Sequence, residues 1–362
     1  MMEDHLEGAK KGRPSNIVFE PVPLGKLHNG TVYNKSDYFS QALEVLLAVG
    51  LVGTSLIILM ACDHTLNAVT YGALIALQSA LMTQLVMQFH DGLHFAIFRR
   101  ARLNTALSRV IGSYCLWPTT FLRESHLQHH RRAGLVEDDP EVLHFSPEFI
   151  ERNRWAGLLN RLAQTSWAPL LFTPLLQAVH FARYFRQTVL VKRNPPALRA
   201  YFVEVSMMFA TWAVISHFLK TPIASFLAGH FVPSLIAMSL VYWAAKPLHT
   251  QMMGGPLPEL DSTSRTLSIA RSFESNRLVR LFFANLGFHI EHHLQPSVSR
   301  WNLPRLAASL RPQLEKFANE QQLPFAYHRS YRRWYQHIGS KLPTHNAIRT
   351  LDEWKIQNPS NV

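Results

Sequence analysis

Three short clusters of histidine are the part of this sequence best suited to chemistry. The chain has 19 histidines in 362 residues, and eight of them fall within residues 90–94, 126–130 and 289–293. The first cluster reads His-x-x-x-His, and each of the other two reads His-x-x-His-His. Residues three or four positions apart share one face of a helix, so the imidazoles of each cluster can point at one site.

These imidazoles are the predicted metal ligands: His90, His94, His126, His129, His130, His289, His292 and His293. Eight imidazoles gathered in one region cannot all be charged together, and neutral imidazole is the commonest metal ligand. One ion would leave several of them unused, so the set fits two ions. Imidazole suits iron, zinc and copper, so the ligand type leaves the metal open. Two cysteines, Cys62 and Cys115, cannot form a disulfide framework or a cysteine-based zinc site.

Long apolar runs must position these clusters. Three runs carry no charged residue and a fourth carries only Glu204; the four runs are 45–62, 66–89, 200–219 and 223–245. Each run is close to the length needed to cross a bilayer. The alternative, four buried helices of a large soluble protein, would not require runs of this length. Segments of three residues, 63–65 and 220–222, connect the four runs into two pairs. We therefore expect an all-α integral membrane fold, with four transmembrane helices in two hairpins and a cytosolic helical cap holding a histidine-rich two-metal site.

The placement of basic residues predicts an orientation. Lys plus Arg number 36 against 24 Asp plus Glu, and of the basic residues only Lys220 lies in a hairpin turn. By the positive-inside rule, the hairpin turns face away from the cytosol, and the termini and histidine clusters face it. The expected location is the inner membrane in a bacterium or the endoplasmic reticulum in a eukaryote.

A fifth uncharged stretch, residues 162–182, is also long enough to span, and it contains Pro169 and Pro174. A single crossing there would place the third histidine cluster on the opposite side of the membrane from the first two. We therefore expect an interfacial or re-entrant helix. The predicted organisation is a polar cytosolic segment at 1–40, one membrane domain at 41–312 and a cytosolic extension at 313–362. No cleaved signal peptide is expected, because no basic start leads into a short apolar core.

With these motifs, the chain resembles the membrane-bound fatty acid desaturase and hydroxylase superfamily, and within it the desaturase branch. The three clusters match its histidine boxes, and the similarity extends to the surrounding Arg123-Glu124-Ser125 and Leu294-Gln295-Pro296, over roughly residues 40 to 312. The resemblance implies four membrane helices under a cytosolic cap with a non-haem di-iron centre. It also implies a ninth ligand, for which His249 is the first candidate and His144 a weaker one. Asn285, four residues before His289 and so expected on the same helix face, could hold a bound water.

The resemblance further implies an oxidoreductase that uses O2 and two iron ions to introduce a double bond into a fatty acyl chain. No dinucleotide fingerprint or Cys-x-x-Cys is present, so we expect electrons from a ferredoxin or cytochrome b5 partner docked on the basic face. Asp91, Glu124 and Glu291 are expected to orient imidazole N–H groups or to pair with basic neighbours, and no catalytic residue is assigned beyond the ligands.

Other functions stay open at this point. A carotenoid or lipid hydroxylase or ketolase shares the boxes, and a related enzyme could desaturate a specialised non-lipid metabolite. The chain lacks the Glu-His-x-x-Gly-His-His and Asn-Tyr-x-x-His-Tyr-Gly motifs of alkane hydroxylases, and its third box opens with His289 where front-end desaturases usually have Gln. A metal-dependent membrane hydrolase and a non-catalytic metal-binding membrane protein are the alternatives from other classes. The basic aromatic segment 327–335 is expected to anchor at the membrane interface, and no nucleic-acid partner is expected.

Overall fold

A computed structural model describes most of the helical part of the chain. The described residues are 38–61, 67–133, 152–153, 155, 158, 178, 182, 185–186, 195–220, 222–245, 248–249, 266–267, 269–320 and 327–328. The predicted helix at 162–182, the candidate ligand His144, the segment 1–37 and most of 327–335 lie outside these residues, except for isolated positions.

Four long stretches confirm the predicted helical membrane fold. They are α1 (Tyr38–Ala61), α2 (Ala68–Leu93), α8 (Pro195–Leu219), and the continuous series α9 (Ile223–Phe226), η3 (Leu227–Phe231) and α10 (Val232–Ala245). In each of the four, a helical stretch is long and apolar enough to cross a membrane. Helix α1 begins before the uncharged run because its one acidic residue, Glu44, is fully buried and paired, and so does not end the helix.

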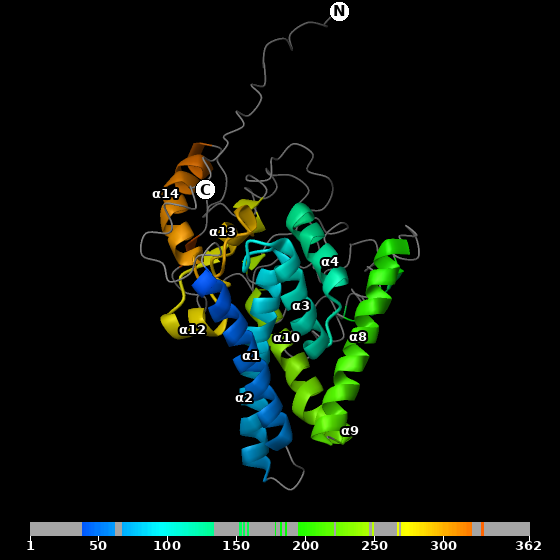
Figure 1. The fold of residues 1–362 in the computed structure, drawn as a ribbon. Coiled ribbons are helices and arrows are strands. Elements are labelled where there is room, and N and C mark those ends of the chain that lie inside the picture. The colour runs from blue at the N-terminus through cyan, green and yellow to red at the C-terminus, as the bar shows by residue number, and fades with distance from the viewer. Residues whose placement is uncertain are drawn as a thin grey trace, which may run out of the picture.

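The long helices extend to one end of the molecule, where α1 ends, α2 begins and α8 lies beside α9 (Figure 1). Helix α2 is central, since it packs against α1, α3 (Ala101–Cys115) and α10, while α8 packs against α3 and α4 (Thr119–Arg132). The shorter elements lie toward the other end (Figure 1); they are β1 (Ser272–Phe273), α12 (Arg277–Phe282), α13 (His289–Leu294), α14 (Leu303–Glu320) and β2 (Tyr327–His328), with β1 and β2 forming a short parallel pair. The described part of the chain therefore has an apolar helical end and an end with the shorter elements.

Helix α14 packs against α13, which carries the third histidine cluster. The apolar side of α14 forms a buried cluster with Ile290 of α13, in which Leu306 and Leu314 are fully buried. The predicted boundary at residue 312 falls inside this helix, at Pro312. Gly287 precedes α13, where a Cβ would lie 2.8 Å from the carbonyl oxygen of Phe273, so the close contact between β1 and this turn requires glycine.

Helices α3 and α4 form a hairpin that the hydropathy pattern did not predict. Its turn is tight: Leu116 has a left-handed φ of 63°, and the Trp117 N–H donates to the Gly112 carbonyl at 2.7 Å. A Cβ at Gly112 would lie 2.5 Å from the Trp117 carbonyl oxygen and 2.7 Å from Thr119 Oγ1. Glycine is therefore required at the point where the chain reverses.

Polar contacts hold this turn among the apolar helices. The Tyr114 hydroxyl is 2.6 Å from Ser55 Oγ of α1, which also accepts from Gln78 Nε2 of α2 at 2.6 Å. The Tyr114 carbonyl, near the C-terminal end of α3, accepts from Trp212 Nε1 of α8 and His230 Nε2 of η3, both at 2.9 Å. Carbonyls at a helix end lack partners within the helix, and leaving one unpaired in an apolar setting is costly. Side chains from all four long stretches thus fix the depth of the hairpin.

Replacing Gly112 with alanine is expected to destabilise the protein, because the added methyl group overlaps backbone and side-chain atoms of the turn. Overpacking of this kind costs about 1–3 kcal/mol. The measurement is the thermal unfolding midpoint in detergent. Gly72→Ala is the matched control, since a Cβ at Gly72 in α2 meets nothing within 4 Å. Equal midpoints for the two variants would contradict this account of the turn.

Candidate metal centre

Four segments bring histidines to one place in the fold. The last turn of α2 carries His90, and His94 follows directly as its C-cap. Helices α4 and α13 carry the second and third clusters. His249 follows α10 and pairs with Ala270 in an isolated antiparallel bridge, with the Arg271 N–H donating to the Leu248 carbonyl at 2.9 Å.

The first group of histidines joins α2, α4 and α13. Its members have donor nitrogens within 4.8 Å of one another and could hold a metal ion; they are His90, His94, His126 and His292. His130 adjoins this group, with its Nε2 atom 3.2 Å from His126 Nε2 and its ring centroid 4.6 Å from that of His94.

The second group joins α4, α13 and the segment after α10. Its donor nitrogens also lie within 4.8 Å of one another, and its members are His129, His249, His289 and His293. The Nε2 atom of His249 is 3.2 Å from those of His129 and His293 and 2.6 Å from that of His289. The two groups adjoin, because the rings of His130 and His293 stack with centroids 4.1 Å apart. His249, which the sequence proposed only by resemblance, thus lies at the centre of this group.

The grouping explains the His-x-x-His-His spacing. On α4, the i,i+4 pair His126 and His130 faces the first group, and His129 faces the second. On α13 the arrangement is exchanged: the i,i+4 pair belongs to the second group, and His292 belongs to the first. Residues four apart share a helix face, and a residue between them is turned away by roughly 100° per step. Each helix therefore contributes to both groups.

The donor sets fit metal ions. Two nitrogens bound to one ion at about 2.0–2.1 Å lie about 2.9–3.4 Å apart in octahedral or tetrahedral geometry, and the 3.2 Å separations fall in that range. The Nε2 atoms of His94 and His292 are buried, and neither forms a hydrogen bond with another described residue. A buried polar atom without a partner is unfavourable, and an ion between the rings would supply the missing interaction.

Burial keeps five of these imidazoles neutral. It lowers the pKa values of His94, His289, His292 and His293 well below the usual range, and repulsion from neighbouring imidazoles lowers them further. The pKa of His130 is lowered for the same reasons. Neutral imidazole is the form that binds metal, so this environment preserves the ligands' lone pairs.

The metal-free protein is expected to lose stability in acid. An imidazole whose pKa is lowered on folding takes up its proton more readily in the unfolded chain, so stability falls as the pH drops below about 6.5, by up to about 1.4 kcal/mol per pH unit for each group. The thermal unfolding midpoint of chelator-treated protein should be level from pH 7 to 8 and fall from about pH 6.5 to 5. An unchanged midpoint across that range would contradict the neutral state of these rings.

A buried ion network connects the first and third clusters. Arg300, which is 2% exposed, donates from Nη1 to Asp91 Oδ2 at 3.3 Å and from Nη2 to Glu44 Oε2 at 3.2 Å. Trp301 Nε1 donates to Glu44 Oε1 at 3.1 Å, and the Gln88 amide also bonds this carboxylate. The network joins α1, the histidine-bearing end of α2 and the loop after α13. Neither Glu44 nor Arg300 was identified from the sequence.

The acidic candidates near the boxes make other contacts. Asp91 bonds Arg300, and its Oδ1 atom is 3.7 Å from His90 Nδ1, beyond hydrogen-bond distance. Glu291 is fully buried and accepts from Ser272 Oγ at 2.7 Å, and burial raises its pKa to about 7. Partial burial also raises the pKa of Glu124. A role for these carboxylates in orienting imidazoles stays a prediction.

Asn285 requires a correction. The expectation that it shares a helix face with His289 is wrong, because α13 begins at His289 and Asn285 lies in the preceding turn with a left-handed φ of 62°. Its amide donates to the Arg300 carbonyl at 3.0 Å. Asparagine tolerates this backbone region better than most residues, which accounts for its presence in the turn. Its contact with a bound water stays a prediction.

The fold and the site together define a helical membrane protein with two groups of histidines that could hold metal ions. The model of the fatty acid desaturase family matches residues 66–325, and the chain belongs to that family.

Three relatives illustrate the range of similarity. Fatty acid desaturase 3 of Bos taurus is 24% identical over 60% of this chain and 50% of its own length. The Delta(5) fatty acid desaturase fat-4 of Caenorhabditis elegans is 22% identical over 67% of this chain and 56% of its own. The Delta(8)-fatty-acid desaturase 2 of Arabidopsis thaliana is 25% identical over 88% of this chain and 70% of its own. The chain thus spans little more than half the length of the first two.

Proposed function

We propose that this protein is an O2-dependent desaturase that introduces a double bond into a fatty acyl chain at a di-iron centre. The observation that carries the proposal is the pair of adjoining all-histidine groups at the end of four apolar helices. Membership of the fatty acid desaturase family supports the reaction class, and it favours iron among the metals that imidazole suits.

The two ions would be held by nine histidines. His90, His94, His126, His130 and His292 would hold one, and His129, His249, His289 and His293 the other. When bound, such a centre activates O2 to remove hydrogen from an unactivated C–H bond. The imidazoles supply nitrogen donors, and the Arg300 network joins the end of α2 to the loop after α13.

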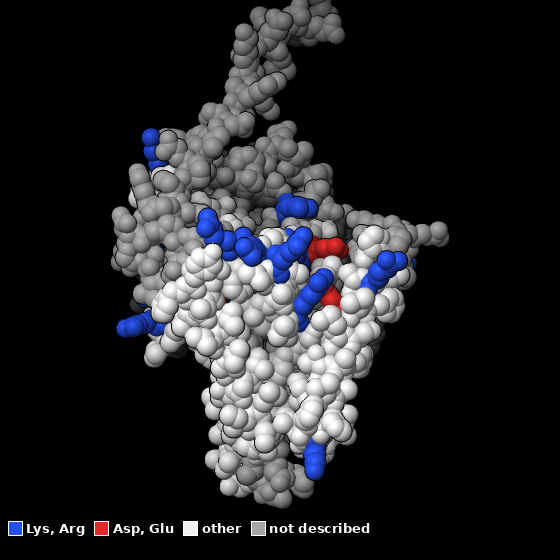
Figure 2. Space-filling model, in the orientation of Figure 1, with Lys and Arg blue, Asp and Glu red and all other residues white. Residues whose placement is uncertain are grey.

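The orientation and the electron source are also proposals. The exposed arginines on the described surface include Arg99, Arg100 and Arg102, which precede or begin α3. Figure 2 shows basic side chains in a band across this face, above a helical end nearly without charged side chains. The band matches the level of lipid headgroups on the cytosolic side, and a ferredoxin or cytochrome b5 type carrier with an acidic surface would be attracted to this side.

Lipid analysis of an expressing host tests the reaction. Cells with the wild-type chain should contain a new unsaturated acyl product, and cells with His129→Ala should not. Fatty acid methyl esters analysed by mass spectrometry, with O2 present and withheld, distinguish the outcomes. A hydroxylated or keto product would identify the protein as a hydroxylase or ketolase instead of a desaturase. Product formation without O2 would contradict the proposal.

A further inference from the structure

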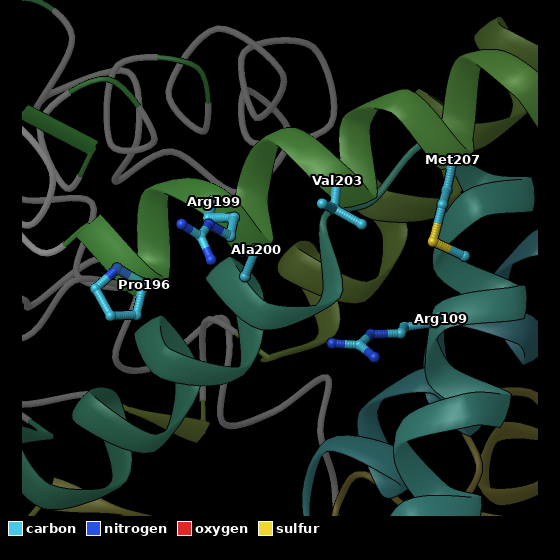
Figure 3. A pocket seen from close by; sticks show the side chains of 6 residues that line it. All are labelled: Arg109, Pro196, Arg199, Ala200, Val203 and Met207. Carbon is cyan, nitrogen blue, oxygen red and sulfur yellow. The ribbon is translucent and has the colours of Figure 1, made fainter.

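A groove lies between α3 and α8, away from the histidine groups. Its cavity volume is about 400 Å³, and its lining consists of Arg109 from α3 and five residues of α8: Pro196, Arg199, Ala200, Val203 and Met207. Figure 3 shows the two guanidinium groups extending into the space between the helices, with the apolar side chains following along α8. Val203 is 54% and Met207 41% exposed, so the apolar wall faces the surroundings.

Arg109 is fixed in place from one side. Its Nε atom donates to Glu204 Oε1 at 3.2 Å. Glu204 is 4% exposed and also accepts from the Thr120 backbone N–H at 2.8 Å and from Thr120 Oγ1 at 2.6 Å. Because Nε makes this bond, the two terminal amino groups of Arg109 remain available at the end of the guanidinium that lines the groove. Guanidinium donors in such a fork match phosphate oxygens.

The charge of the groove suits a monoanion. Arg109 and Arg199 contribute two positive charges and Glu204 one negative charge, which leaves a net charge of one positive. A phosphodiester carries one negative charge, so a bound phosphodiester would complete the balance. The bond to Glu204 holds the Arg109 guanidinium in a fixed position. An arginine exposed only to solvent has no such bond.

The position of the groove suits a lipid. Arg199 lies at the start of Leu198–Leu219, a stretch long and apolar enough to cross a membrane, so in a bilayer it would lie at the level of the headgroups. Val203 and Met207 follow about 6 Å and 12 Å further along the helix axis, toward the bilayer interior. They lie on the same face of α8 as Arg199, since the spacing is four residues. A molecule with its phosphate at the arginines would thus have its acyl chain beside these side chains.

We propose that this groove is a binding site for an anionic phospholipid of the surrounding leaflet. Its phosphate contacts Arg109 and Arg199, and one acyl chain lies along Ala200, Val203 and Met207. The site uses none of the histidines, so its occupancy does not depend on the metal centre or on the proposed reaction.

Native mass spectrometry of the full chain in detergent tests the site, with phosphatidylglycerol as the anionic probe and phosphatidylcholine as the zwitterionic one. The wild type should bind phosphatidylglycerol in preference. Each arginine near the membrane surface contributes about fivefold, so the double variant Arg109→Gln with Arg199→Gln should lose about 25-fold in affinity. Arg305→Gln is the control, because Arg305 is an exposed arginine of α14, outside the groove and outside the basic band near α3.

A second variant separates a lipid site from a general attraction between charges. Ala200→Trp fills the groove without changing its charge, and it should weaken phosphatidylglycerol binding while both arginines remain. Glycerol phosphate added at the lipid's concentration should not displace the lipid. The proposal would be overturned if Arg305→Gln weakened binding as much as the double variant, if Ala200→Trp bound like the wild type, or if glycerol phosphate displaced the lipid.

Discussion

Replacing His293 with alanine is expected to abolish desaturation. His293 Nε2 is 3.2 Å from His249 Nε2, and its ring stacks on His130, so it contacts both histidine groups. Loss of an outer partner of a metal ligand already costs about 10–100-fold in metal affinity or activity, so loss of a ligand should cost more than about 100-fold. The measurement is the amount of unsaturated product per amount of membrane-inserted protein, together with bound iron.

His217→Ala is the matched control. This histidine is exposed near the end of α8, outside both groups, so its variant should retain product formation and iron. Because both substitutions remove one imidazole, the comparison separates a specific effect from a general loss of histidine. Near-normal product formation by the His293 variant would count against the metal assignment.

Replacing Arg300 with methionine is expected to cause the largest loss of stability. The substitution leaves the carboxylates of Asp91 and Glu44, both almost fully buried, without their shared positive charge. Removing one partner of a buried ion pair costs about 3–5 kcal/mol, because a buried charge remains uncompensated. The thermal unfolding midpoint in detergent should fall accordingly. Since Asp91 follows His90 directly, bound metal should decrease as well.

Two further variants test the cause. Arg311→Met removes an arginine whose side chain is 35% exposed and which pairs with Glu274 and Glu315; a surface pair of this kind is worth about 0–1 kcal/mol. Adding Glu44→Gln and Asp91→Asn to the Arg300 variant removes the buried charges and should restore part of the lost stability. An Arg300 variant as stable as the Arg311 variant would contradict the role of the network.

Local patterns predict the helices and the histidine groups well. Hydropathy locates four stretches that could span a membrane because each apolar run is itself long enough to form one. The histidine boxes can be identified because i,i+3 and i,i+4 spacing fixes side-chain direction within a single helix. The assignment of individual histidines to one group or the other, by contrast, depends on how α4 and α13 lie beside each other.

Contacts between distant segments could not be predicted from one sequence. Arg300 meets Glu44 across 256 residues and Asp91 across 209, and no local pattern links them. The hairpin of α3 and α4 escaped prediction because α3 carries arginines and is shorter than a membrane span. One signal was present: Glu204 interrupts an apolar run, and an acidic residue in such a place usually has a partner, here Arg109 and Thr120.

Metal analysis of purified, active protein tests the central claim most directly. Elemental quantification combined with Mössbauer spectroscopy of iron-57-grown material should find two iron ions per chain, and both should be lost together with activity in the His293 variant. One zinc ion per chain, or full activity without any transition metal, would contradict the proposed di-iron centre.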